Sequence, residues 1–305
     1  MTMTNKGLRL HFRVADLGYC IVFDDEATEY QWMLPTHGRF FQKTPAEEPV
    51  FTLEVGASRV KDETEGLEEV GHFPSGDSSY DVFRLPDGGF KIRIVDLQGV
   101  TVCVFTTSAK FDHCEATLFG DEVQQRFGLQ NCVMVCYAFS GAHHGVLMMH
   151  ASVVRHGGRG YLCQGKSGTG KSTHTRLWLE HIPGCDLLND DNPAIRLMPD
   201  GEARVYGTPW SGKTPCYKQE WVPVGGFLRL HQAPHNKIRQ YQPLEAFASI
   251  LSSCSTMIWD EPSYNGICQT ISGICRVANA YDMECLPDAD AAKTSHAMMC
   301  GCDIC

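Results

Sequence analysis

The sequence predicts a mixed α/β chain whose N-terminal region is rich in β-strands. Three observations support this fold class. Alternating apolar and polar residues, typical of half-buried strands, recur up to about residue 118. A helical pattern begins near Asp121. Further on, a glycine-rich loop lies between a short apolar segment with the pattern of a strand and an amphipathic segment with the pattern of a helix.

The N-terminal region contains short segments that alternate or are wholly apolar, as strands do. A Pro-Asp-Gly sequence between two of them favours a hairpin turn. Residues 56–79 are polar and rich in Gly, Ser and Glu, and we expect a loop there. The predicted strands of this region are 8–15, 19–23, 90–96 and 100–107.

From Asp121 onward, helical and strand patterns alternate. We place a domain boundary near residue 118, which gives a β-rich domain over 1–118 and a nucleotide-binding domain over 119–295. A short Cys-rich tail, 296–305, follows. The predicted strands include 145–157, 159–164 and a pair over 224–232 and 237–244, and the predicted helices include 173–182, 243–253 and 266–278.

Composition narrows the class of function. The chain has 305 residues and a net charge of -10, which argues against a general nucleic-acid binder. No run of apolar residues is long enough to span a bilayer or to form the core of a signal peptide, so we expect no membrane partner. The 15 cysteines are scattered and several lie in apolar runs, which indicates reduced thiols in a core and a cytoplasmic location.

The glycine-rich loop carries the strongest functional signal. Residues 165–172 match G-x-x-x-x-G-K-[ST] in full, after an apolar strand and before an amphipathic helix. Glycines let backbone amides turn inward around phosphate oxygens, Lys171 adds a positive charge, and the hydroxyl of Ser172 is suited to ligate Mg²⁺. The candidate residues for binding ATP or a related phosphate donor are Gly165, Gly168, Thr169, Gly170, Lys171, Ser172 and Thr173.

A pair of acidic residues, Asp190 and Asp191, follows Lys171 by 19 and 20 positions. In phosphate-loop proteins an acidic residue at the end of a neighbouring strand holds the metal ion. A second carboxylate could accept the proton of an attacking hydroxyl. The alternative is a plain polar turn, because Asn-Asp-Asp-Asn-Pro has strong turn composition.

Three segments together resemble the HPr kinase/phosphorylase group, which shares its fold with phosphoenolpyruvate carboxykinases. They are the strand Met149–Val154 with its histidine, the loop QGKSGTGKST and the acidic segment LLNDDNPAI. The segment Tyr206–Gly212 is also similar to a sequence motif found among relatives of these kinases. The resemblance covers about residues 120–280. The chain departs from these enzymes at Thr173, where they often have an acidic residue, and in having GTPWSG in place of their glycine-rich signature.

The resemblance implies roles at the matching positions. Lys171 and Ser172 would bind phosphates and Mg²⁺, Asp190 and Asp191 would supply a metal ligand and a base, and His150 would be an auxiliary catalytic group. Ser172 and Asp190 are the candidate metal ligands. Which aspartate is the base stays open at this point.

We therefore expect an ATP- and Mg²⁺-dependent kinase that phosphorylates a hydroxyl of a protein, a peptide or a small molecule. The alternative is an ATP-binding sensor or regulatory module without catalysis, for which a base would be unnecessary. A carboxykinase would need further metal ligands and an oxaloacetate site, for which the sequence has no clear motif. The sequence leaves open the acceptor, the direction of transfer and whether the chain forms a homo-oligomer.

The C-terminal segment carries four potential soft ligands, His296, Cys300, Cys302 and Cys305. Four such groups could bind zinc. The Cys-x-Cys spacing is tighter than in usual structural sites, however, so we expect a frayed, reduced tail.

Overall fold

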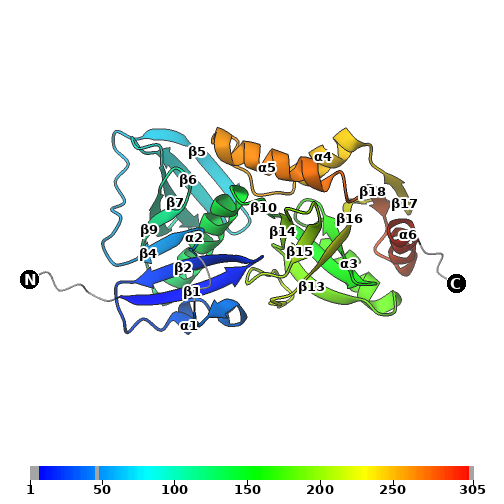
Figure 1. The fold of residues 1–305 in the computed structure, drawn as a ribbon, viewed down its shortest axis with the longest axis horizontal. Helices are drawn as coiled ribbons and strands as arrows, with labels where there is room; N and C mark the ends of the chain where they lie inside the picture. Colours follow the sequence, from blue (N-terminus) through cyan, green and yellow to red (C-terminus); the bar gives the residue numbers. More distant parts are fainter. Residues whose placement is uncertain (1–6, 45–47, 302–305) are drawn as a thin grey trace, which may run out of the picture. The chain divides into compact units, whose positions relative to one another are not determined.

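The computed structural model describes residues 7–44 and 48–301. The chain forms two compact units, Met1–His143 and His144–Cys305. Within the described residues there are two large mixed sheets and six helices (Figure 1). The mixed α/β class and the β-rich N-terminal region are thereby confirmed, whereas the assignment of a phosphate-loop core remains a proposal. The two units divide at His143 and not near residue 118.

The first unit is built on a nine-stranded sheet with the order β3-β1-β2-β4-β9-β8-β7-β6-β5. The pairs β2–β4 and β4–β9 are parallel and the others are antiparallel. Two short helical elements, α1 (Tyr30–Met33) and η1 (Gly38–Phe40), lie between strands. The strands are β1 (Leu8–Val14), β2 (Leu17–Phe23), β3 (Phe41–Gln42), β4 (Thr52–Val55), β5 (Glu68–Ser75), β6 (Ser78–Arg84), β7 (Phe90–Asp96), β8 (Thr101–Thr107) and β9 (His113–Leu118).

Helix α2 (Glu122–Ala142) belongs to the first unit because it packs on strands β7, β8 and β9. It starts at the predicted cap, Asp121, whose carboxylate accepts hydrogen bonds from two amides of the first turn. A Cβ at Gly128 would lie 2.6 Å from the carbonyl oxygen of Val102, so glycine is needed for the close approach of α2 to β8. This packing explains why the boundary follows α2 instead of preceding it.

The second unit contains another large mixed sheet. The long strand β16 (Trp221–Gln232) pairs along one edge with β12, and along the other with β15 near its start and β18 near its end. The remaining strands are β10 (Val146–Met148), β11 (Ala151–His156), β12 (Arg159–Gln164), β13 (Asp186–Asp191), β14 (Ala194–Leu197), β15 (Ala203–Tyr206), β17 (Lys237–Gln240) and β18 (Ala280–Cys285).

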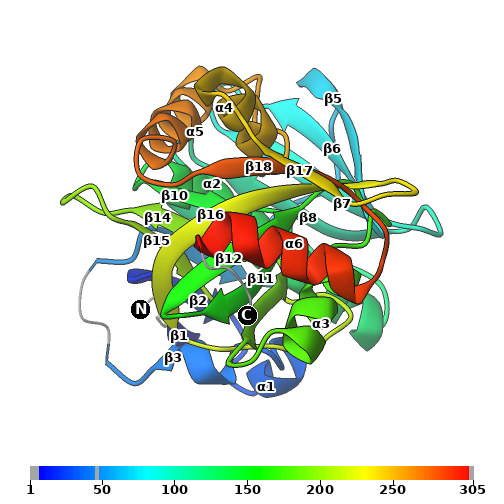
Figure 2. The same cartoon turned by 90° about the vertical axis from the view of Figure 1, so that its right-hand side faces the viewer.

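Helices cover both faces of this sheet. On one face, α3 (Lys171–His181) packs on β11, β12 and β13, and α6 (Ala289–Cys300) packs on α3 and β16 (Figure 2). Tyr161 and Cys163 of β12 point into the core on this side. Gln164, which alternation turns to the opposite face, contacts α4 (Pro243–Leu251), so α4 lies on the other side with α5 (Glu261–Ile274) packed against it.

Most of the strands predicted from alternation are present, but three expectations were wrong. Residues 68–75, expected as loop, form β5, and Ser78 and Ser79 begin β6. The predicted pair 224–232 and 237–244 is separated by β18, which pairs with both β16 and β17. Helix α5 begins at Glu261, five residues before the predicted start at Gly266, because Asp260 caps it.

Within the described residues, no helix is both long and apolar enough to cross a membrane. Several of the described cysteines are buried, among them Cys132, Cys136 and Cys163. Burial raises the pKa of the Cys163 thiol to about 12, which keeps it protonated and inert in the core.

Buried His174 gives the second unit a pH-dependent stability. It is 3% exposed on α3, its Nε2 atom lies 2.9 Å from the Ser295 hydroxyl, and burial lowers its pKa to about 4. In the unfolded chain this histidine has its ordinary pKa near 6.5. Between pH 6.5 and 4 the unfolded chain therefore binds a proton that the folded chain does not bind.

We expect protonation of His174 in the unfolded chain to lower the free energy of unfolding by about 3 kcal/mol as the pH falls from 6.5 to 4. The variant His174→Gln should lose less stability over this window because its amide does not titrate. Urea unfolding followed by tryptophan fluorescence at both pH values measures the difference. His181→Gln, at the more exposed end of the same helix, is the control and should leave the pH dependence of the parent unchanged. An equal pH dependence in His174→Gln and the parent would contradict this account.

Candidate functional site

The glycine-rich loop connects the end of β12 at Gln164 to the start of α3 at Lys171. Gly168 and Gly170 have φ angles of 81° and 103°, in the region that favours glycine. Gly170 is also the N-cap of α3 and supplies no side-chain cap. The first turn of α3 therefore presents amide donors and the positive end of its dipole to the loop.

Contacts within the loop and from β16 hold it in shape. The amide and hydroxyl of Thr169 both donate to the carbonyl of Lys166, at 3.2 and 2.8 Å. Gln232, the last residue of β16, donates from Nε2 to the carbonyl of Gly168 at 3.1 Å. Sequence reasoning missed Gln232 because it lies more than 60 positions from the loop and belongs to no motif. It is brought there only by the pairing of β16 with β12.

Among the described residues, no anionic group is in direct contact with the Lys171 ammonium. Its Nζ donates to the carbonyls of Gly165 and Lys166, at 3.1 and 3.3 Å, and the residue is 9% exposed. Burial lowers the pKa of Lys171, while the carboxylates of Asp191 and Asp190 act in the opposite direction. An ammonium group that is hydrogen bonded only to neutral carbonyls would form stronger hydrogen bonds with an anionic ligand.

Asp190 is buried beside the loop and accepts three hydrogen bonds. The antiparallel register of β11 and β13 places Ser152 opposite Asp190. Oδ1 of Asp190 accepts from the hydroxyls of Ser152 and Ser172, at 2.9 and 2.8 Å, and Oδ2 accepts from the Thr214 amide at 3.2 Å. Only 3% of Asp190 is exposed. Ser172 and Asp190, both expected from the sequence, are thus brought together.

Ser152 is a site residue that sequence reasoning missed. Its hydroxyl is buried between Asp190 and Thr175, whose Oγ1 lies 2.9 Å away and also 2.9 Å from the Lys171 carbonyl. A serine within an otherwise apolar strand is a weak signal, because the sequence does not show which buried acid it faces. Its place in the network depends on the register of β11 against β13.

Asp191 and His150 form a more exposed pair. Because Ala151 lies opposite Asp191 in the same register, His150 comes next to Asp191 at the end of β11. Nε2 of His150 is 3.2 Å from Oδ1 of Asp191, and their side chains are 46% and 36% exposed. The His150 amide donates to the Ser253 carbonyl at 2.7 Å, which fixes the backbone of the histidine.

The segment 207–214 closes around the acidic pair. The amide of Gly212 donates to the Asp190 carbonyl at 2.5 Å, and Ser211 forms a β-bridge with Asp191. A Cβ at Gly212 would lie 2.6 Å from the Asp190 carbonyl oxygen, so only glycine permits this approach. Asn189 donates from Nδ2 to Thr208 Oγ1 at 3.1 Å and anchors the start of the segment.

The oxygen atoms around Ser172 fit a magnesium ion. Ser172 Oγ and Asp190 Oδ1 are 2.8 Å apart. Neighbouring ligands of an octahedral Mg²⁺ with bonds of about 2.0–2.1 Å are about 2.9 Å apart, so both oxygens could serve one ion. Hydroxyl and carboxylate oxygens are also the ligands that Mg²⁺ prefers. Thr173 follows on α3 as a half-buried residue.

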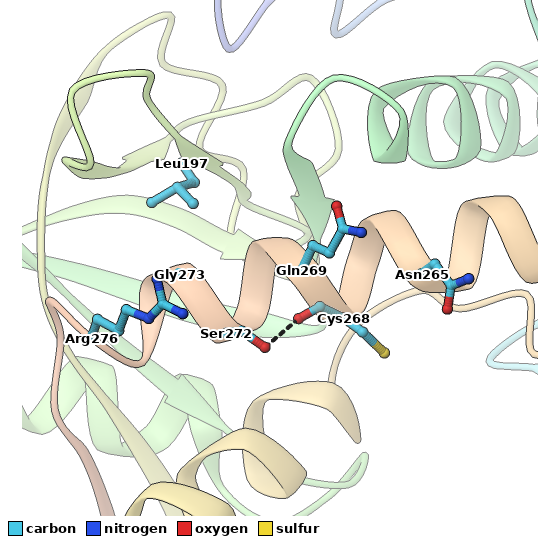
Figure 3. A pocket seen from close by; sticks show the side chains of 7 residues that line it. All are labelled: Leu197, Asn265, Cys268, Gln269, Ser272, Gly273 and Arg276. Atoms are coloured by element: carbon cyan, nitrogen blue, oxygen red, sulfur yellow. Dashed lines mark hydrogen bonds between the residues drawn. The ribbon is translucent and has the colours of Figure 1, made fainter.

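A separate hollow on α5 has a volume of about 430 Å³ (Figure 3). No residue of the glycine-rich loop or of the acidic pair lines it, and Arg276 is the one charged group among its described lining residues. Asn265, Gln269 and Ser272 are side chains along the surface of α5, and the Ser272 hydroxyl donates to the Cys268 carbonyl within the same helix. The Cys268 thiol also lines the hollow, but its described lining residues include no carboxylate.

We expect Ser152→Ala to lower the unfolding free energy by about 1.5–3 kcal/mol, because a buried carboxylate loses one of its donors. Chemical denaturation of the purified protein measures this change. Ser167→Ala, on the exposed part of the loop, is the matched control and should stay close to the parent. Equal stabilities of the two variants would show that the hydroxyl of Ser152 does not support Asp190.

No protein-family model matches this chain, and no curated protein matches its sequence. A functional interpretation therefore rests on the residues of the site and on their arrangement.

Proposed function

We propose that this protein is an ATP-dependent kinase that transfers a phosphoryl group to a hydroxyl of a protein, a peptide or a small molecule. One observation carries the proposal: Ser172 of the glycine-rich loop is hydrogen bonded to the buried Asp190, while the neighbouring Asp191 stays accessible. Phosphoryl transfer to a hydroxyl needs a loop that binds phosphate, a carboxylate that binds the metal ion and a carboxylate that accepts the hydroxyl proton.

The loop would bind the phosphates. The amides of Gly170, Lys171 and Ser172 lie at the start of α3, where the helix dipole favours an anion. The Lys171 ammonium would exchange its carbonyl partners for phosphate oxygens, which are stronger acceptors because they are charged. Ser172 and Asp190 would hold Mg²⁺, which when bound neutralises charge on the phosphates.

The two aspartates would have different roles, because their environments differ. Asp190 is buried and saturated by donors, so it is suited to fixed metal binding. Asp191 is partly exposed next to His150, so it can meet an acceptor hydroxyl. This assigns the base to Asp191, with His150 orienting its carboxylate.

The reaction balances without a further reactant. The acceptor oxygen forms a bond to the terminal phosphorus of ATP as the bond to the bridging oxygen breaks. The hydroxyl proton goes to Asp191 and ADP leaves. A hydroxyl of serine type is the acceptor class that this base can serve.

We expect Lys171→Ala to weaken the binding of ATP·Mg²⁺ by about 10- to 100-fold, the usual effect of losing a charged hydrogen bond. The fold should survive, because the hydrogen bonds of the ammonium go to loop carbonyls and not to the core. Isothermal titration calorimetry gives the affinities, and circular dichroism gives the fold. Lys293→Ala, an exposed lysine on α6, is the control and should bind like the parent. Unchanged affinity in Lys171→Ala would remove the nucleotide-binding assignment.

We expect Asp190→Asn and Asp191→Asn to differ in kind. Asp190→Asn should need more Mg²⁺, and excess Mg²⁺ should restore part of the activity because an oxygen ligand remains. Asp191→Asn should lose about 10²–10⁴ in kcat with nucleotide affinity unchanged, since a missing base is not replaced by metal. Slow ATP hydrolysis, with water in place of the acceptor, allows the assay to begin without the natural substrate.

Screening hydroxyl acceptors with labelled ATP then identifies the substrate. If both asparagine variants bind and hydrolyse ATP like the parent, the aspartates are not catalytic. The protein would then be an ATP-binding sensor, which requires the loop but no base.

A further inference from the structure

A second cluster of chemically active side chains lies at the other end of β11. His156 ends this strand, and His296 and Cys300 lie one turn apart on α6, so they share one face of the helix. Nε2 of His296 is 3.2 Å from Nδ1 of His156, and Sγ of Cys300 is 4.0 Å from the same Nδ1. All three potential ligand atoms lie within 4.8 Å of one another.

Two of these distances are close to the edges of a zinc tetrahedron. With Zn–N bonds of about 2.0–2.1 Å and Zn–S bonds of about 2.3 Å, two nitrogens on one zinc are about 3.3 Å apart, and a nitrogen and a sulfur about 3.6 Å. The nitrogen–nitrogen distance of 3.2 Å and the nitrogen–sulfur distance of 4.0 Å in the cluster lie close to these two values. Small side-chain adjustments would bring all three atoms to one ion.

The side chain of His296 is buried among aromatic rings. His296 is 5% exposed, and its Nδ1 is a buried atom without a hydrogen-bond partner among the described residues. Its ring packs against Trp178 at 5.2 Å and His156 at 4.6 Å between centroids.

The cluster is separate from the candidate phosphate site. Residues 150 and 156 lie six positions apart along an extended strand, which corresponds to about 20 Å. Nitrogen and thiolate ligands also select a different ion from the hydroxyl and carboxylate oxygens at Ser172 and Asp190.

We propose that His156, His296 and Cys300 bind one zinc ion, with water in the fourth position, and that this ion fastens helix α6 to strand β11. His296 and Cys300 lie within helix α6, so the expectation of a frayed tail was wrong for these two residues. Cys302 and Cys305, the other members of the sequence pattern, lie outside the described residues. The functional partner of Cys300 is His156, 144 positions earlier in the chain.

The full-length protein tests this proposal directly. After removal of metal, it should take up one equivalent of zinc in competition with a chromophoric chelator, and its melting temperature should rise. Cys300→Ser and His156→Gln should each weaken zinc binding by at least about 100-fold, beyond the usual effect of an outer-shell change. Cys285→Ser, a half-buried thiol against the same core, is the control and should bind zinc like the parent.

Cobalt provides a spectroscopic test of the thiolate ligand. Co²⁺ added to the metal-free parent should give a thiolate charge-transfer band in the near ultraviolet, which Cys300→Ser should lack. The proposal fails if the parent binds no stoichiometric zinc and shows no such band. It also fails if the double variant Cys302→Ser/Cys305→Ser abolishes binding while Cys300→Ser and His156→Gln retain it.

Discussion

The antiparallel register between β11 and β13 is the constraint on which the candidate site depends. It sets Ser152 opposite Asp190 and Ala151 opposite Asp191, so one acid is directed into a buried network and the next toward His150. Because neighbouring residues of a strand face opposite sides, two consecutive aspartates receive different surroundings from a single pairing. A slip by one residue would exchange the two environments and leave a carboxylate buried without donors.

The parts of the fold that could be read from the sequence are those specified locally. Alternation located β1 and β7, and a short apolar segment located β12. The Pro-Asp-Gly turn located the β6–β7 hairpin because proline and glycine fix its backbone. Strand β5 was missed since its residues are mostly exposed and polar, and it is held mainly by pairing with β6. The domain boundary was misplaced because the apolar face of α2 does not indicate which sheet it covers.

The candidate site shows the same limit. The loop and the aspartates follow a motif, so the sequence alone suffices to name Lys171, Ser172 and Asp190. Ser152, Gln232 and the Thr214 amide come from other strands and segments and have no spacing relative to the loop. The His156 cluster is a further example, because a histidine at a strand end gains meaning only when α6 packs beside it.

The start of α3 differs from that of other helices in this chain. Helices α2, α5 and α6 each begin on an aspartate whose carboxylate caps the first turn, whereas α3 begins on Gly170 with no side chain to do so. Glycine in place of such a cap costs about a few tenths of a kcal/mol, so the first turn of α3 is slightly less stable than a turn capped by aspartate. Its amides should exchange with solvent hydrogen sooner than the rest of the helix, and an anion at the loop would slow them. Hydrogen exchange in this turn would therefore be the most sensitive measure, within the helix, of whether an anion is bound at the loop.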